Sequence, residues 1–114
     1  MPPPDDLTAL QHMIESASKA VRFSRGRRRS DLDHNELLNL ALVQLLEIIG
    51  EAANGISETM RERYPDIAWR EMSAMRNRLV HAYFEINSDI VWQTVTKELP
   101  PLIKQLEKIL KKKD

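Results

Sequence analysis

Apolar residues recur at spacings of three and four along most of this chain, which is the period of an amphipathic helix. After the opening prolines, one such stripe predicts a first helix that fades near Phe23. We expect Asp5 and Asp6 to cap its start, because a carboxylate there accepts hydrogen bonds from free backbone N–H groups. The stripe consists of Leu7, Leu10, Ile14, Ala17 and Val21.

A second, longer helix is predicted from Asp31 or Asp33 to about Ser57. Its middle, residues 37–49, is apolar almost all round, and a helix of that kind is buried on more than one side. In so small a bundle, the additional apolar face indicates a partner subunit. Gly50 lacks a side chain, so we expect another helix to approach closely at that point.

The chain after this helix predicts a short helix over 57–63, which Tyr64 and Pro65 end because proline disfavours helix at the residue before it. Asp66 is expected to cap a third helix over 67–84. The inward stripe of this third helix is predicted to be Ala68, Met72, Met75, Leu79 and Ala82.

A fourth helix is predicted after the turn and cap at 87–89, and it runs from residue 90 to the lysine tail. Pro100 and Pro101 fall inside it and must kink or interrupt it, since each removes a backbone hydrogen-bond donor. Helices joined by short connections predict an all-α bundle of four to five helices.

Length and composition agree with a single helical domain. The chain has 114 residues, which is enough to bury a core of its own. Leu, Ala, Glu, Lys and Arg dominate and Gly is scarce, as is typical of helical proteins. We expect one domain over 1–114, with its core over 5–108 and flexible ends at 1–4 and 111–114.

Charge and cysteine content exclude several classes of protein. The 17 basic and 17 acidic residues give zero formal charge, so any contact with nucleic acid must come from a local patch. Without cysteine there are no disulfides, thiolate metal sites or thiol nucleophile. No apolar run approaches the roughly 20 residues that span a bilayer, and the first residues lack the regions of a signal peptide. We therefore expect a soluble cytoplasmic protein without membrane association.

Metal and nucleotide cofactors are not expected either. His12, His34 and His81 show neither the His-x3-His spacing nor the dense carboxylate cluster of a metal site. A Gly-rich phosphate loop is also absent from the sequence, which excludes the common ATPase pattern.

Two arginines, an amide, an imidazole and a phenol fall within eight residues near the end of the predicted third helix. The donor fork of arginine fits phosphate oxygens, and histidine takes and gives protons near neutral pH. On a continuous helix, Arg76 and Tyr83 share a face while Asn77 and His81 stack beside them. Arg78 points elsewhere. This surface suffices in principle for phosphodiester cleavage without a metal.

Two other polar groups are weighed against plain structural roles. Glu47 and Glu51 stand one turn apart amid the apolar run, where they either form the polar strip of the helix or support a catalytic group; Glu51 is our candidate for support. The basic connector over 25–30 is either a solvated loop or a phosphate-binding element. Its candidate RNA-binding residues, together with one arginine just upstream, are Arg22, Arg25, Arg27, Arg28 and Arg29.

The segment 76–83 resembles the Arg-x4-His-x-Tyr motif of the HepT family of HEPN-domain toxins. Residues 45–53 resemble the second-helix signature of that family, and 64–69 and 89–92 match its usual spacing. Two separated motifs in the right order make the resemblance specific, and it covers roughly residues 5–108.

This resemblance implies a HEPN bundle that works as a homodimer and cleaves RNA as a metal-independent endoribonuclease. Arg76 and His81 of two subunits would face each other across a cleft as catalytic residues, with Asn77 and Glu51 in support, and the product would end in a 2′,3′-cyclic phosphate. The resemblance also implies a toxin paired with an MntA-type nucleotidyltransferase antitoxin, which transfers AMP to Tyr83.

The residues alone leave two other functions open. In the first, the chain is a non-catalytic helical subunit of a two-component nucleotidyltransferase, in which Arg76 and His81 hold a nucleotide phosphate. In the second, it is a dimeric scaffold or an antitoxin that tolerates alanine at every site position. RNA turnover by the isolated protein distinguishes both from a ribonuclease.

Overall fold

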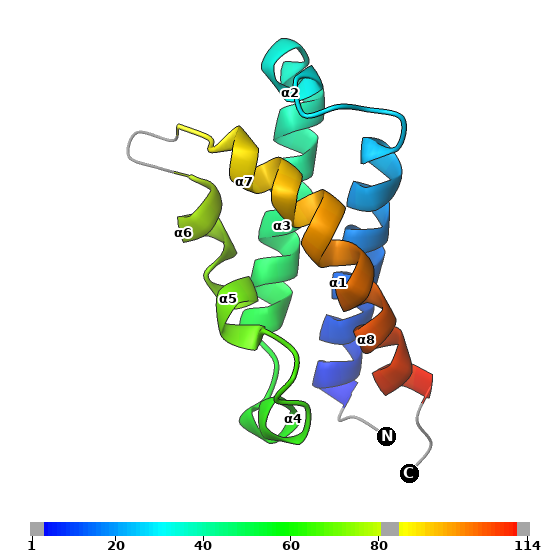
Figure 1. Ribbon diagram of the computed structural model, residues 1–114. Helices are drawn as coiled ribbons and strands as arrows, with labels where there is room; N and C mark the ends of the chain where they lie inside the picture. The colour runs from blue at the N-terminus through cyan, green and yellow to red at the C-terminus, as the bar shows by residue number, and fades with distance from the viewer. Residues whose placement is uncertain (1–3, 81–84, 112–114) are drawn as a thin grey trace.

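The computed structural model describes residues 4–80 and 85–111. Over these residues it is a bundle of helices with no β-strand apart from one isolated bridge (Figure 1). The two long helices, α1 (Pro4–Ser24) and α3 (Glu36–Asn54), pack side by side and run in opposite directions. The predicted all-α class is confirmed.

The predicted first helix is present, but Asp6 does not cap it. The Asp6 carboxylate is buried and accepts hydrogen bonds from the backbone N–H and the hydroxyl of Ser57, so it joins the start of α1 to the start of α4 (Glu58–Arg63). Ser57 in turn caps α4 by accepting a hydrogen bond from the Met60 N–H. The predicted short helix is therefore confirmed, with a tertiary anchor that the local sequence pattern does not reveal.

The predicted second helix is divided in two. A short helix, α2 (Asp31–His34), ends at Asn35, and α3 begins at the next residue. The Asn35 backbone leaves the helical region, and its side-chain oxygen accepts a hydrogen bond from the Leu38 N–H at 3.0 Å. Asparagine favours such a cap over a helix interior because its short polar side chain satisfies a free backbone donor.

The prediction of one third helix over 67–84 is wrong. The chain forms two one-turn helices, α5 (Trp69–Ser73) and α6 (Met75–Leu79), with Ala74 between them. The predicted cap, Asp66, is also wrong, because α5 begins after Ala68 without a side-chain cap.

The end of α6 has a tertiary cause. Val80 is extended and pairs with Ile86 in an isolated antiparallel bridge, and the Asn87 N–H donates to the Leu79 carbonyl at 2.7 Å. These partners replace the hydrogen bonds that a continuing helix would make, so α6 ends at Leu79. A helix through position 80 is therefore excluded.

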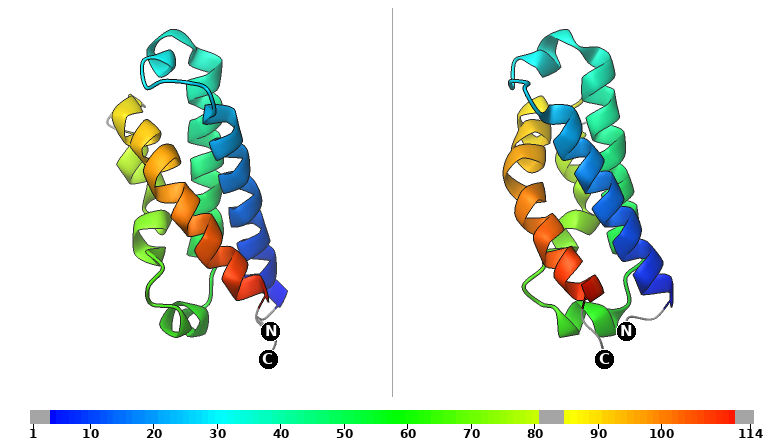
Figure 2. Two further views of the ribbon diagram at one scale, coloured as in Figure 1. Left: turned by 45° about the vertical axis from the view of Figure 1, so that its right-hand side comes forward. Right: turned by 90° about the vertical axis from the view of Figure 1, so that its right-hand side faces the viewer.

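The last arm of the fold crosses the two long helices diagonally (Figure 2). It consists of α7 (Ser88–Gln93), the π-helical segment η2 (Thr94–Glu98) and α8 (Leu99–Lys111). Asn87 caps α7 as the sequence predicts. The predicted interruption takes the form of η2, which ends at Glu98, while Pro100 and Pro101 lie in the first turn of α8.

The core lies where α3 meets α1, the two short helices and the last arm. Gly50 lies at the closest approach between α3 and α5–α6, since a Cβ atom on it would stand 2.8 Å from the Met72 carbonyl oxygen and 3.0 Å from the Met75 Cβ. The predicted close approach at Gly50 is thus confirmed. The largest fully buried side chains include Leu10, Met13, Leu42, Leu46, Ile49, Met75, Leu79 and Leu106.

Candidate functional site

The helix α6 carries the first half of the sequence motif. Met75 and Leu79 are 1% and 0% exposed and pack into the core, which leaves Arg76 and Asn77 on the exposed side of the helix. One turn of helix therefore presents a guanidinium and an amide to solvent while its apolar side holds it against α3.

Arg76 lines a pocket of about 200 Å³ between α3 and the start of α6. Glu47 and Glu51 line the same pocket from α3, and Ser73 lines it from the end of α5. The fold thus brings Glu51, our candidate for support, to the same pocket as Arg76. Two carboxylates and one guanidinium give this pocket a mixed charge, in which a carboxylate is able to orient the arginine donors.

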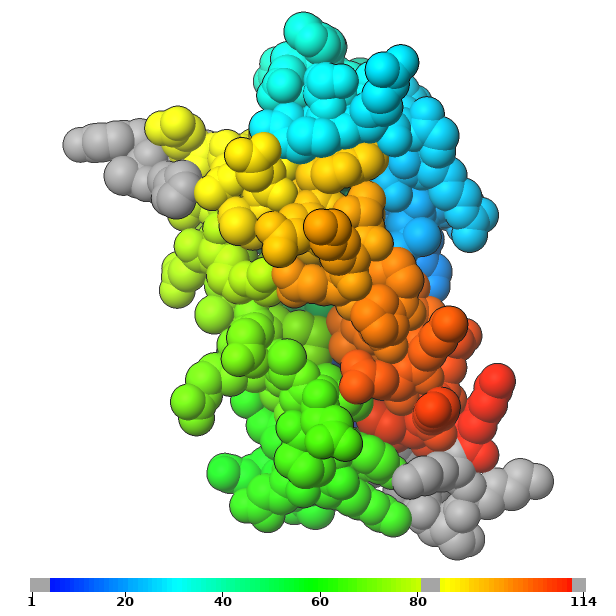
Figure 3. All heavy atoms as spheres, in the orientation of Figure 1, coloured from blue at the N-terminus to red at the C-terminus, as the bar shows by residue number. Residues whose placement is uncertain are grey.

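Arg78 points away from this pocket, as the sequence predicts. Its guanidinium binds both carboxylate oxygens of Glu98 in η2, at 3.2 and 2.9 Å. This pair lies beside a hollow of about 300 Å³ that Glu98 helps to line. The hollow separates α5–α6 from η2–α8, where the green and orange segments meet in Figure 3.

His81 and Tyr83, the other half of the motif, lie outside the described residues. The structure describes the residues on either side of this segment. The Val80–Ile86 bridge and the hydrogen bond from Asn87 to Leu79 hold these two sides together. The sequence-based expectation that Asn77 and His81 stack on one continuous helix no longer holds, because the helix ends at Leu79.

The basic connector contains one arginine that is fixed by carboxylates. Arg29 donates to Asp89 at 2.6 Å and to Asp33 at 3.0 Å, and so ties the connector to the first turn of α7. Hydrogen bonds to Asp33 and Asp89 raise the pKa of Arg29 above its usual value. Arg29 is therefore an internal tether in this structure.

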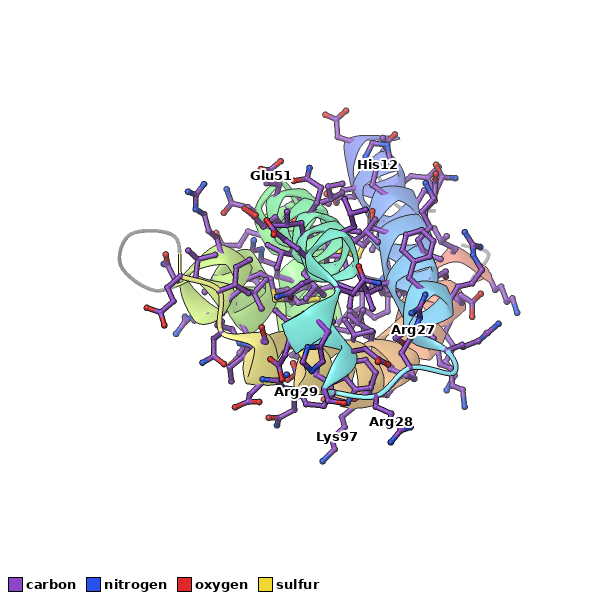
Figure 4. The ribbon with its side chains drawn as sticks, turned by 90° about the horizontal axis from the view of Figure 1, so that it is seen from above. His12, Arg27, Arg28, Arg29, Glu51 and Lys97 are labelled. Carbon is purple, nitrogen blue, oxygen red and sulfur yellow. The ribbon has the colours of Figure 1, made fainter. Side chains whose placement is uncertain are left out.

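The other predicted RNA-binding residues are exposed. Arg22 lies over the Phe23 ring, with 5.8 Å between the guanidinium carbon and the ring centroid. Seen along the bundle, Glu51 lies on the opposite side from Arg27 and Arg28 (Figure 4). The connector and the Arg76 pocket therefore do not share a face of one protomer.

Sequence patterns did not reveal Arg61. Its guanidinium donates to the Ala53 carbonyl at 2.8 Å, the Ile56 carbonyl at 3.3 Å and the Ser73 hydroxyl at 3.3 Å. It therefore joins the end of α3 to the end of α5, two elements that line the Arg76 pocket. All three acceptors depend on tertiary packing, so no local signal indicates this role.

The described part of the chain has neither a metal-binding cluster nor a membrane-spanning helix. Within residues 4–80 and 85–111, no group of three or more His, Cys, Asp or Glu residues is placed to hold a metal ion. None of the helices in this part of the chain has the length and apolar character needed to cross a membrane.

Comparison with known proteins places these features in a family. The family described as "Ribonuclease HepT-like" matches residues 13–109. A protein of Caldanaerobacter subterraneus subsp. tengcongensis named "Putative RNase" is 36% identical over 103 residues, which cover 90% of this chain and 92% of the relative.

Two archaeal relatives are similar over almost the whole chain. A protein of Methanocaldococcus jannaschii, also named "Putative RNase", is 34% identical over 111 residues, which cover 97% of this chain and 92% of the relative. The "Probable ribonuclease HepT" of Thermococcus cleftensis is 34% identical over 107 residues, which cover 94% and 92%. No solved structure matches the chain.

Proposed function

This chain belongs to the HepT-like ribonuclease family, and we propose from that membership that it is an endoribonuclease which cleaves RNA without a metal ion. The observation that carries the residue assignment is the pocket that Arg76 shares with Glu47 and Glu51. An exposed guanidinium with carboxylates in the same pocket is suited to hold a phosphate in one orientation.

Arg76 is proposed to bind the scissile phosphate and to offset the charge that builds on its oxygens. Glu51 orients the Arg76 guanidinium from across the pocket, and Asn77 orients either His81 or a phosphate oxygen. Since both Arg76 and Asn77 are exposed on one short helix, an RNA backbone reaches them without any opening of the core.

His81 is proposed to supply the proton transfers. A histidine acting as base takes the proton of the RNA 2′-hydroxyl, whose oxygen attacks phosphorus while the bond to the 5′-oxygen breaks. A histidine acting as acid gives a proton to the leaving 5′-oxygen. The products are a 2′,3′-cyclic phosphate and a 5′-hydroxyl, so DNA, which lacks the 2′-hydroxyl, is not cut.

The proposed reaction needs a base and an acid, but each chain has only one His81. A homodimer would supply both groups, and we therefore propose that the chain works as a homodimer. Leu37 and Leu40 support this proposal, because they are 83% and 48% exposed on α3, the helix that also carries Glu51. Exposed leucines one turn apart mark an interaction surface. We propose that a second copy packs on this face of α3.

The chain is further proposed to be the toxin of a toxin–antitoxin pair. An MntA-type nucleotidyltransferase would inhibit it by transferring AMP to Tyr83. Bulk and negative charge on Tyr83 oppose an RNA backbone that must approach Arg76, because phosphate groups repel each other.

The test is RNA cleavage by the purified chain in EDTA, with the product ends mapped. We expect cyclic phosphate ends from wild type and loss of cleavage in His81→Ala and Arg76→Ala. His12→Ala is the matched control, since His12 is an exposed histidine of α1 (Figure 4), and it should cleave like wild type. Full activity in His81→Ala would exclude the mechanism, and inactivity of a folded, unmodified wild-type dimer would favour a nucleotide-binding subunit.

A further inference from the structure

Arg78 lies within the motif, but its side chain contacts a different part of the fold from that of Arg76. Two residues correspond to about 200° around a helix, so the two guanidinium groups leave α6 on different sides. Arg76 lines the pocket against α3, whereas Arg78 binds both oxygens of Glu98. Its side chain is 27% exposed and that of Glu98 is 43% exposed.

The position of Glu98 follows from the π-helical segment that it ends. Pro100 and Pro101 have no N–H to donate to the preceding turn. In that preceding turn the Thr94 and Thr96 hydroxyls donate to the carbonyls of Ile90 and Trp92, both at 2.7 Å. The wider turn of η2 ends at Glu98, two residues before Pro100, and wide turns of this kind are frequent at functional sites.

The helix that bears Arg76 is too short to hold its own position. It spans five residues, and isolated helices shorter than about 12 residues are marginal in water. The contact with Gly50 fixes the start of this segment against α3. The Arg78–Glu98 pair connects its last turn to η2, so α6 is held from two sides.

We propose that Arg78 and Glu98 are positioning residues, which set the place of α6 and hence the direction of the Arg76 guanidinium. This inference rests on the proposed ribonuclease function. Both side chains of this pair are partly exposed, so its contribution to global stability is small and the proposed role is the local placement of α6. Small displacements of a phosphate-binding group lower the rate of the chemical step strongly.

The experiment is a charge exchange, followed by steady-state RNA cleavage in EDTA. We expect Arg78→Glu and Glu98→Arg each to lower kcat by about tenfold, with a smaller change in KM. The double variant, which restores an ion pair in the opposite sense, should recover most of the wild-type kcat. Arg78→Lys should lie nearer to wild type than Arg78→Glu does, because it keeps the positive charge and a single nitrogen of Arg78, Nη2, makes both contacts with Glu98.

Two further readouts separate positioning from folding and from RNA contact. The Val80 N–H, which donates to the Arg76 carbonyl at 3.0 Å, should exchange with solvent faster in the single variants and normally in the double variant. In an Arg76→Ala background, where cleavage is already lost, Arg78→Glu should cause no additional loss of RNA affinity. Arg70→Ala is the control, since Arg70 is an exposed arginine of the neighbouring helix α5.

The outcomes are distinguishable. This inference would be wrong if wild type cleaves RNA and Arg78→Glu has the same kcat as wild type. It would also be wrong if the double variant is as impaired as the single ones. Either result would leave the proposed function standing. An unmodified, folded wild-type chain that cleaves no RNA would overturn the proposed function and this inference with it.

Discussion

The buried Asp6 carboxylate accepts two hydrogen bonds from Ser57, 2.8 Å from the backbone nitrogen and 2.6 Å from the hydroxyl oxygen. A hydrogen bond to a charged group contributes about 1.5–3 kcal/mol, and two that share one carboxylate are not additive. We therefore expect Asp6→Ala to lower the free energy of unfolding by about 2–3 kcal/mol, measured by urea denaturation. Asp5→Ala is the control, since Asp5 is exposed; equal losses in both variants would contradict this assignment.

Gly50→Ala should destabilise the chain even though alanine favours helix. The new Cβ would stand 2.8 Å from the Met72 carbonyl oxygen, and overpacking of this kind costs about 1–3 kcal/mol. Gly55→Ala is a matched control, because its Cβ would meet nothing closer than 3.5 Å. The midpoint of thermal unfolding should therefore fall in Gly50→Ala and stay near the wild-type value in Gly55→Ala. A Gly50→Ala variant as stable as wild type would contradict the close approach.

The connector arginines should separate into two groups in RNA binding. Arg27→Gln with Arg28→Gln should reduce the salt dependence of RNA affinity, by a slope of about 0.7 for each phosphate contact with a single strand. Arg29→Gln should leave that slope nearly unchanged, because Asp33 and Asp89 already bind this guanidinium. An arginine is protonated throughout the neutral range, so this tether should persist there. Affinities measured over a potassium chloride series test both expectations.

Leu37→Glu should convert the proposed dimer to a monomer. Leu37 is 83% exposed on α3, so a charge there costs the protomer little but opposes burial against a second copy. Phe23→Glu is the control, since Phe23 is also an exposed apolar residue (40%) but lies on α1. Sedimentation velocity distinguishes the two; a Leu37→Glu dimer would place the interface elsewhere.

The sequence predicts the elements whose cause is local, and it misses those whose cause is tertiary. The sequence predicts the stripe of α1 and the cap at Asn87, because side-chain spacing and a capping amide act within a few residues. It also predicts a close approach at Gly50 from the missing Cβ, but not that Met72 and Met75 make that approach. The end of α6 at Leu79 was not predicted, because its cause is a hydrogen bond from Asn87 across the following loop.

The same distinction applies to the candidate site. Arg76 and Asn77 are identified by the motif, and their exposed positions depend only on the short helix that carries them. Arg29 appears in the sequence as one of several connector arginines, and only the fold shows that Asp89, sixty residues later, binds it. Arg61 has no sequence signal, since its acceptors on α3 and α5 come together only in the folded chain.

The opposite placement of Glu51 and the connector arginines (Figure 4) has a consequence for the footprint of a substrate. The two shorter dimensions of the bundle are 30 and 20 Å, and a strand that touches both places on one protomer has to pass around it. A very short oligonucleotide in the Arg76 pocket therefore does not reach the connector. On the proposed function, the connector would add affinity only for longer RNA, so it would select substrates by length and leave the choice of the cleaved bond to the pocket.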